Sequence, residues 1–130
     1  MSAREIHIIC VSGTREKLQM AAMIASVSAA CGDAVTVFFS MNALNYFIKG
    51  NTDEAPVEGE FGTLMEKQGV PPFRQLFNQA AELGDAKLLP CSMAIDLLEL
   101  GENDLDPDFG PPTGLTRFLS DSEGGQLLSF

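Results

Sequence analysis

The chain has few residues suited to metal, disulfide or nucleic-acid chemistry. Its 130 residues include one histidine, three cysteines, no tryptophan, and only 8 lysines and arginines against 18 acids, for a net charge of -10. Cys10, Cys31 and Cys91 are an odd number at wide spacing, which suits neither a disulfide framework nor a zinc site with paired ligands. Phosphate binding needs clustered basic residues, so the composition argues against a nucleic-acid partner. An acidic surface instead favours basic partners.

The chain also lacks a continuous apolar run of membrane-spanning length, and residues 1–5 lead into a strand pattern without the apolar core of a signal peptide. We therefore expect no membrane association and a cytoplasmic location. Hydrophobic residues make up 45% and charged residues 20% of the sequence, as in ordinary globular proteins. A length of 130 residues suits one domain, which we expect to span residues 1–130.

Strand-like and helix-like patterns alternate along the chain. Continuous β-branched runs predict buried parallel strands, and alanine-rich or amphipathic runs between them predict crossover helices. The expected strands are 5–11, 34–39, 86–90 and 126–130, and the expected helices are 15–31, 41–48, 73–83, 92–98 and 113–119. Residues 49–72 and 101–112 read as irregular connections. These patterns predict an α/β fold with a mostly parallel sheet.

Cys91 lies where the strand at 86–90 gives way to the helix at 92–98. The first-turn amides of a helix have no internal partners and the helix dipole is positive there, so this position stabilises a thiolate. The alternative is a half-buried cysteine packed as a small hydrophobe. Amides of residues 92–94 are candidates to hold an anionic sulfur group. Ser92 and Met93 are possible supporting residues, although Ser92 also suits an ordinary cap and Met93 ordinary gap filling.

Ligands of open α/β sheets gather outside the carboxyl ends of the strands. The loops 12–14, 40–42 and 90–93 should therefore converge on one edge, with Ser12 and Gly13 as possible contributors to the site. Cys10 ends the first strand and by the same geometry is a possible partner of Cys91, although a cysteine inside an apolar strand is more often core packing. The lone His7 reads as a satisfied core histidine and supports no metal site.

Several segments resemble the DsrE/DsrF-like sulfur-relay family, in particular its DsrE-like peroxiredoxin-family or sulfur-carrier branch. They are VSGTREKLQMAAMIASVSAACGDAVTVFFSMNALNYFIK, AAELGDAKLLPCSMAIDLLEL and GPPTGLTRFLS, in that order, and together they cover most of the chain. The second resembles the family's active segment, in which Cys-x-Met follows a strand. Some members carry a second cysteine shortly after the first, whereas residues 96–101 here hold no thiol.

The resemblance implies a doubly wound α/β fold in a three-layer, flavodoxin-like arrangement. It also implies a cytoplasmic sulfur carrier that accepts sulfane sulfur on Cys91, as a persulfide or thiosulfonate, and passes it on. It also implies a homo-oligomer, a trimer or a multiple of one, that exchanges sulfur with TusA-like or rhodanese-like carriers, and it implies no cofactor. Two other readings remain. Ser12-Gly13-Thr14 between strand and helix suits a module that binds flavin or nucleotide phosphate, although no tryptophan is available to stack a flavin. The other is a non-catalytic structural subunit of a sulfur-transfer complex.

Overall fold

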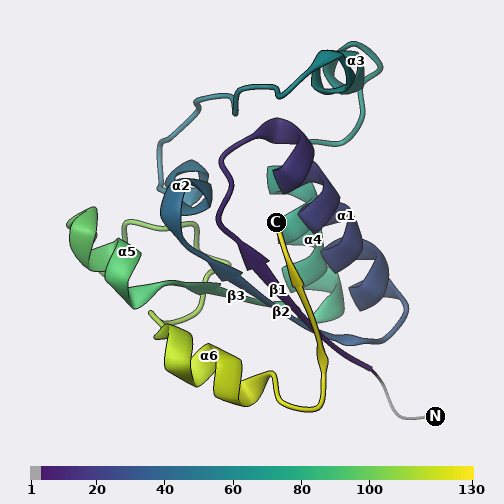
Figure 1. The fold of residues 1–130 in the computed structure, drawn as a ribbon. Coiled ribbons are helices and arrows are strands. Elements are labelled where there is room, and N and C mark those ends of the chain that lie inside the picture. Colours follow the sequence, from purple (N-terminus) through teal and green to yellow (C-terminus); the bar gives the residue numbers. More distant parts are fainter. Residues whose placement is uncertain (1–3) are drawn as a thin grey trace.

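The protein folds around a four-stranded parallel sheet in a computed structural model that describes residues 4–130. The strands are β1 (Glu5–Cys10), β2 (Ala34–Phe39), β3 (Lys87–Pro90) and β4 (Gln126–Ser129), in the order β3-β2-β1-β4. Helices α1 (Arg15–Ala30) and α4 (Phe73–Gly84) pack together over one face, and α6 (Leu115–Asp121) covers the other (Figure 1). The sheet grows from β1 toward β3 and then returns past β1 to β4. This reversal is the doubly wound α/β architecture that the family resemblance implies.

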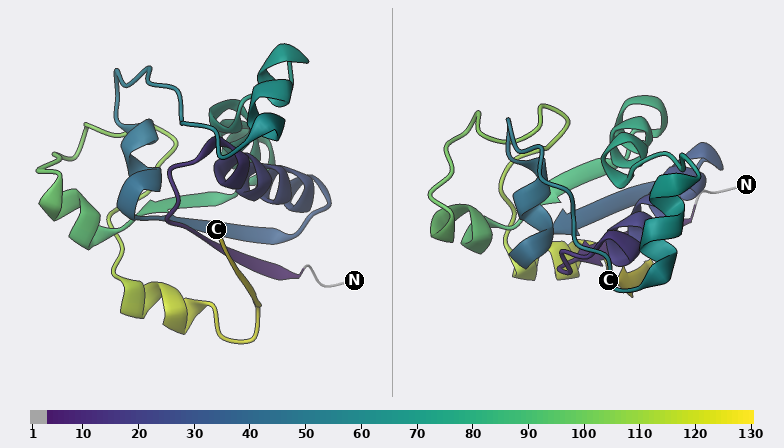
Figure 2. Two further views of the ribbon diagram at one scale, coloured as in Figure 1. Left: turned by 45° about the horizontal axis from the view of Figure 1, so that its top comes forward. Right: turned by 90° about the horizontal axis from the view of Figure 1, so that it is seen from above.

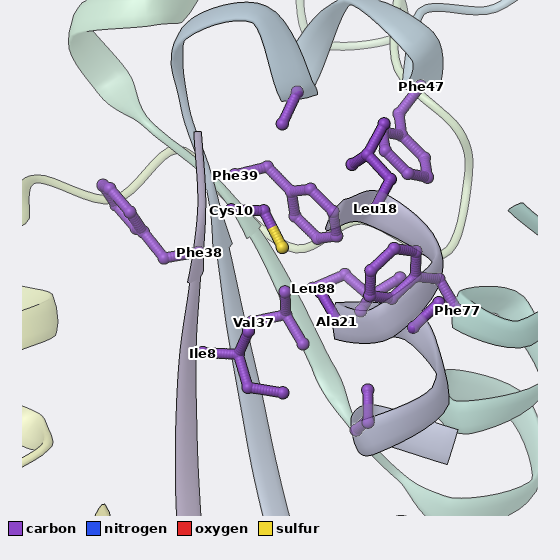
Figure 3. Close-up of a cluster of buried hydrophobic side chains, with 14 of the residues drawn as sticks. Ile8, Cys10, Leu18, Ala21, Val37, Phe38, Phe39, Phe47, Phe77 and Leu88 are labelled. Atoms are coloured by element: carbon purple, nitrogen blue, oxygen red, sulfur yellow. The ribbon is translucent and has the colours of Figure 1, made fainter. Parts of the chain in front are cut away.

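The core on the α1 side consists of aromatic and aliphatic side chains from alternate strand positions. Phe39 is fully buried and packs against Phe47, Phe77 and Phe109, at ring-centroid distances of 4.7, 5.0 and 4.9 Å. Cys10 lies in the same cluster, between β1 and α1 (Figure 3). Such close packing fixes the strand register, because a slip of one residue would turn each of these side chains to the other face.

The opposite face is covered by α6 and contains the single histidine. Phe38 stacks on Phe118 at 4.9 Å, and His7 meets the same phenyl ring edge-on at 5.9 Å. His7 is 4% exposed, and neither ring nitrogen finds a hydrogen-bond partner among residues 4–130; its Nε2 is 3.6 Å from an oxygen of Glu5. The expectation of a core position is confirmed, but that of a satisfied histidine is wrong. Phe118 and the close approach of Gly125 fill the space around the ring.

The connection 49–72 contains a helix that the sequence pattern did not predict, α3 (Glu60–Lys67). It lies over the start of α1, where Glu16 accepts hydrogen bonds from the amides of Glu58 and Gly59, and Arg15 pairs with Glu54 and Glu66. The remaining elements are α2 (Met41–Leu44), the 3-10 turn Asn45–Phe47, and α5 (Ser92–Leu97). Figure 2 shows α2 and α5 beyond the carboxyl ends of the strands and α3 above α1. No helix in the described part is long and apolar enough to cross a membrane.

Candidate functional site

The carboxyl ends of β1, β2 and β3 meet at one edge of the sheet, as the loop pattern predicts. Parallel pairing puts Cys10 beside Phe39 and Phe39 beside Pro90. One residue further along, the same register puts Ser40 next to Cys91. Both residues are buried. The three predicted loops therefore converge, and Cys91 lies in the row of residues that ends the sheet.

The backbone of Cys91 is anchored on both sides. Its amide donates to the carbonyl of Phe39 at 2.8 Å, and Cys91 forms a parallel bridge with Thr113. The Pro90 carbonyl accepts the Thr113 amide at 2.9 Å, and the Thr113 carbonyl accepts the Ser92 amide at the same distance. Residues 110–113 thus extend the sheet beside β3, and the backbone of Thr113 flanks that of Cys91 on the side opposite Ser40.

Cys91 is the N-cap of α5, with extended backbone angles and no side-chain capping bond. Because Thr113 occupies the Ser92 amide, that amide is not available to an anionic sulfur group. The amides of Met93 and Ala94 have no backbone acceptor within residues 4–130. They are the two first-turn donors left for a ligand.

The other two thiols occupy different environments. Cys10 is 2% exposed in the apolar core, and burial raises the pKa of its thiol to about 12. Because strand side chains alternate between faces, Cys10 and Pro90 point to the α1 side and Cys91 points to the other. β2 separates the two cysteines, so the structure does not bring them together. Cys31 is exposed at the C-cap of α1, near the opposite ends of the strands.

The loop after β1 forms part of a separate hollow of about 400 Å³ at the same edge. Ser12, Gly13 and Thr14 line it together with residues of α2 and Leu98 at the end of α5. The hydroxyls of Ser12 and Thr14 lie 3.2 Å apart, and the Tyr46 hydroxyl donates to the Gly13 carbonyl at 3.1 Å. A Cβ on Gly13 would lie 2.9 Å from Cβ of Asn42, so glycine permits this close packing.

Comparison with known proteins identifies a related family and related folds. A sequence model of the DsrE/DsrF/DrsH-like family matches residues 59–128, more than half of the chain. The chain belongs to this family. The matched part of this DsrE/DsrF/DrsH-like protein includes β3, Cys91 and α5, and membership indicates a role related to sulfur relay. No curated protein matches the sequence.

Two solved structures share the fold of this DsrE/DsrF/DrsH-like protein. The ychN protein from E. coli has a TM-score of 0.70 at 11% identity, covering 99% of this chain and 100% of that one. MTH1491 from Methanobacterium thermoautotrophicum, described as a protein of unknown function, has a TM-score of 0.69 at 9% identity, with the same coverage. At these identities the likeness shows the α/β fold alone.

Sequence reasoning did not identify Thr113 as a neighbour of Cys91. Residues 101–112 read as a loop because glycine, proline and acids break every periodic pattern there. The bridges from Leu88 to Phe109 and from Cys91 to Thr113 depend on tertiary contacts between segments about twenty residues apart. The one indication in the sequence was that the segment GPPTGLTRFLS, which contains Thr113, resembles part of the family.

Proposed function

We propose that Cys91 carries sulfane sulfur and exchanges it with a partner protein. The observation that carries the proposal is the position of this cysteine, which ends β3 and caps α5 at the ligand-binding edge of the sheet, in a protein of a sulfur-relay-related family. Cys10 lies inside β1 in the apolar core and Cys31 lies near the opposite ends of the strands, so Cys91 is the thiol at the junction of a strand end and a helix start.

The transfer step needs no cofactor and no net oxidation. The Cys91 thiolate attacks the outer sulfur of a partner persulfide, R–S–SH, and a new S–S bond forms at Cys91 as the partner's S–S bond breaks. The partner sulfur leaves as a thiolate with the bonding electron pair, and the proton stays on the transferred sulfur. The reverse reaction unloads Cys91 onto an acceptor thiolate. Rates then depend on the thiolate fraction and on access to both sulfurs.

Access requires a local movement, because Cys91 is 5% exposed. The helix that begins next to it is loosely held: α5 has six residues, and of these only Ala94 is buried. A segment with few buried contacts opens at a small fraction of the global unfolding free energy. Opening of α5 at its first turn would expose the thiol while β3 stays in the sheet.

The proposal extends to the partners and the setting. TusA-like or rhodanese-like carriers are the expected exchange partners, because each carries sulfur on a cysteine that can attack or be attacked. A homo-oligomer, a trimer or a multiple of one, in the cytoplasm is the expected form of the carrier.

The test is sulfur loading followed by intact-protein mass spectrometry and peptide mapping. A Cys31→Ser background removes the exposed thiol that would otherwise react, and polysulfide, thiosulfate and tetrathionate serve as donors. We expect added sulfur on Cys91 alone and none in the Cys91→Ser variant, with an unchanged circular dichroism spectrum. Loading that persists in that variant would overturn the proposal. Failure of the folded, reduced protein to load would favour the structural-subunit or small-molecule-binding alternatives, and a yellow colour on purification would favour flavin.

A further inference from the structure

The outer face of α5 is apolar and exposed. Met93, Leu97 and Leu98 are exposed, with Leu97 75% exposed. Met93 and Leu97 are four residues apart and lie on one side of the helix, within two turns of Cys91, and Leu98 follows the last residue of α5. Exposed apolar side chains gathered on one short helix are characteristic of protein contact surfaces.

A hollow of about 610 Å³ lies on the other side of α5, between Ile95, the end of β3 and the segment 100–112. Its apolar walls include Pro90, Ile95, Leu105, Phe109 and Pro111. Pro90 immediately precedes Cys91, and the Ile95 amide donates to the Cys91 carbonyl at 3.0 Å. A chain lying in this hollow would therefore contact the residues that position the thiol.

The chain segment that contains α5 and most of this hollow carries charge of one sign. Between Lys87 and Arg117 the sequence has six acids and no lysine or arginine: Asp96, Glu99, Glu102, Asp104, Asp106 and Asp108. Asp104 and Asp106 accept amides within their own loop. The other acids nearest to α5, at positions 96, 99 and 102, are exposed and form no ion pair within residues 4–130. Lys49 is the basic side chain that lines the hollow.

We infer that the sulfur-bearing partner docks on this α5 surface through an apolar segment flanked by lysine or arginine residues. The inference rests on the proposed function of Cys91 and adds the chemistry of the protein that reaches it. Apolar contact with Met93 and Leu97 supplies affinity, and the acids around it select a basic rim and speed encounter. Docking also contacts the helix whose opening exposes the thiol.

Synthetic peptides bearing a cysteine persulfide test this surface without an identified partner. Three peptides share one apolar centre around the persulfide and differ only in four flanking residues, which are lysine, serine or glutamate. The readout is the second-order rate of sulfur transfer to Cys91 in the Cys31→Ser background. We expect the lysine peptide to react at least about fivefold faster than the glutamate peptide at low ionic strength. The difference should shrink as salt is added.

Two variants with equal charge separate a local effect from a global one. D96N/E99Q/E102Q neutralises the acids near α5, and E60Q/D85N/E123Q neutralises three exposed acids elsewhere; each changes the net charge from -10 to -7. The first variant should lose most of the preference for the lysine peptide and the second should keep it. Leu97→Ser should slow transfer from all three peptides, whereas Leu83→Ser, which changes an 84% exposed leucine on α4, should not.

The outcomes separate the two proposals. Equal rates for the three peptides, or equal loss of preference in both triple variants, would overturn the docking inference while polysulfide loading at Cys91 keeps the carrier function. If neither peptides nor polysulfide load Cys91, the carrier function fails first and the docking inference fails with it.

Discussion

Alkylation of the folded protein at pH 8 should leave Cys10 almost unmodified. Burial raises the pKa of this thiol to about 12, so about one molecule in ten thousand holds it as a thiolate at pH 8. A cysteine with the ordinary pKa of about 8.5 is roughly one quarter ionised at that pH. The difference in thiolate fraction alone is therefore about two-thousandfold, before the core packing that keeps the reagent out is considered.

The assay is a timed pulse of iodoacetamide followed by peptide mapping, with the exposed Cys31 as the internal reference. Cys10 should react at least about a thousandfold more slowly in the folded protein than after unfolding, and far more slowly than the exposed Cys31. In urea, where the core is lost, the two should react at similar rates. Labelling of Cys10 in the folded state at a rate close to that of Cys31 would refute the burial argument and would reopen a role for Cys10 in sulfur chemistry.

The same pKa shift predicts loss of stability in alkali. The folded state keeps the Cys10 proton up to a pKa of about 12, whereas the unfolded chain releases it near pH 8.5, so stability falls as the pH rises between these values. At pH 10 the loss amounts to about 2 kcal/mol. Urea unfolding at pH 8 and pH 10 measures it, and a Cys10→Ala variant should lack this component. An equal pH dependence in that variant would contradict the assignment.

Two further predictions concern the packing around α1. Hydrogen bonds from the backbone amides of Glu58 and Gly59 lower the pKa of Glu16. The stability that these hydrogen bonds contribute is therefore complete above about pH 4.3 and is lost as the pH falls through the lowered pKa. Glu16→Gln should speed amide hydrogen exchange at residues 58–59 at pH 7, and unchanged protection would contradict this. A Cβ on Gly84 would overlap Cβ of Ala29, so Gly84→Ala should destabilise by about 1–3 kcal/mol in urea unfolding, while Gly59→Ala, in open space, should change little.

The strands and long helices could be predicted because each combines a clear hydrophobic period with a clear stop. The second strand matches its expected range of 34–39, and the first helix ends at Ala30, within one residue of its predicted end. Where two signals compete, boundaries move. Gly84 was expected to close its helix, yet it lies inside α4, and Asp85 takes the left-handed C-cap conformation with φ of 57°. An aspartate side chain tolerates this conformation better than most.

The helix α3 shows where local pattern fails. Its eight residues lie between glycines at 59 and 69 and include Gly62, so sequence rules predict an irregular connection. Tertiary contact overrides that preference: Gly62 lies so close to Val57 and Glu16 that no Cβ would fit without displacement. A helix stabilised by another element carries little signal in its own residues.

At the candidate site, the order of strand, cysteine and helix could be predicted from the sequence. Which first-turn amides of α5 already donate a hydrogen bond within the protein could not. A cysteine after a strand and before a helix can be identified along the chain, and parallel pairing then places it beside the end of the preceding strand. Whether the first-turn amides are free depends on a segment twenty residues later, which takes the Ser92 amide through Thr113.

The burial of Cys91 and the exposure of α5 fit together in one physical account. A carrier whose sulfur stood in solvent would lose a persulfide to any thiol that collided with it, because exchange depends on access as well as on thiolate fraction. Here the thiol is buried, and the six-residue helix that begins next to it has exposed apolar side chains and acids that form no ion pair within residues 4–130. A basic, apolar partner gains contact free energy from that helix, and this gain offsets the cost of moving it. Small anions such as thiosulfate make no such contacts and gain no contact free energy from the helix. Transfer from a protein-borne persulfide should therefore be favoured over transfer from thiosulfate at equal concentration.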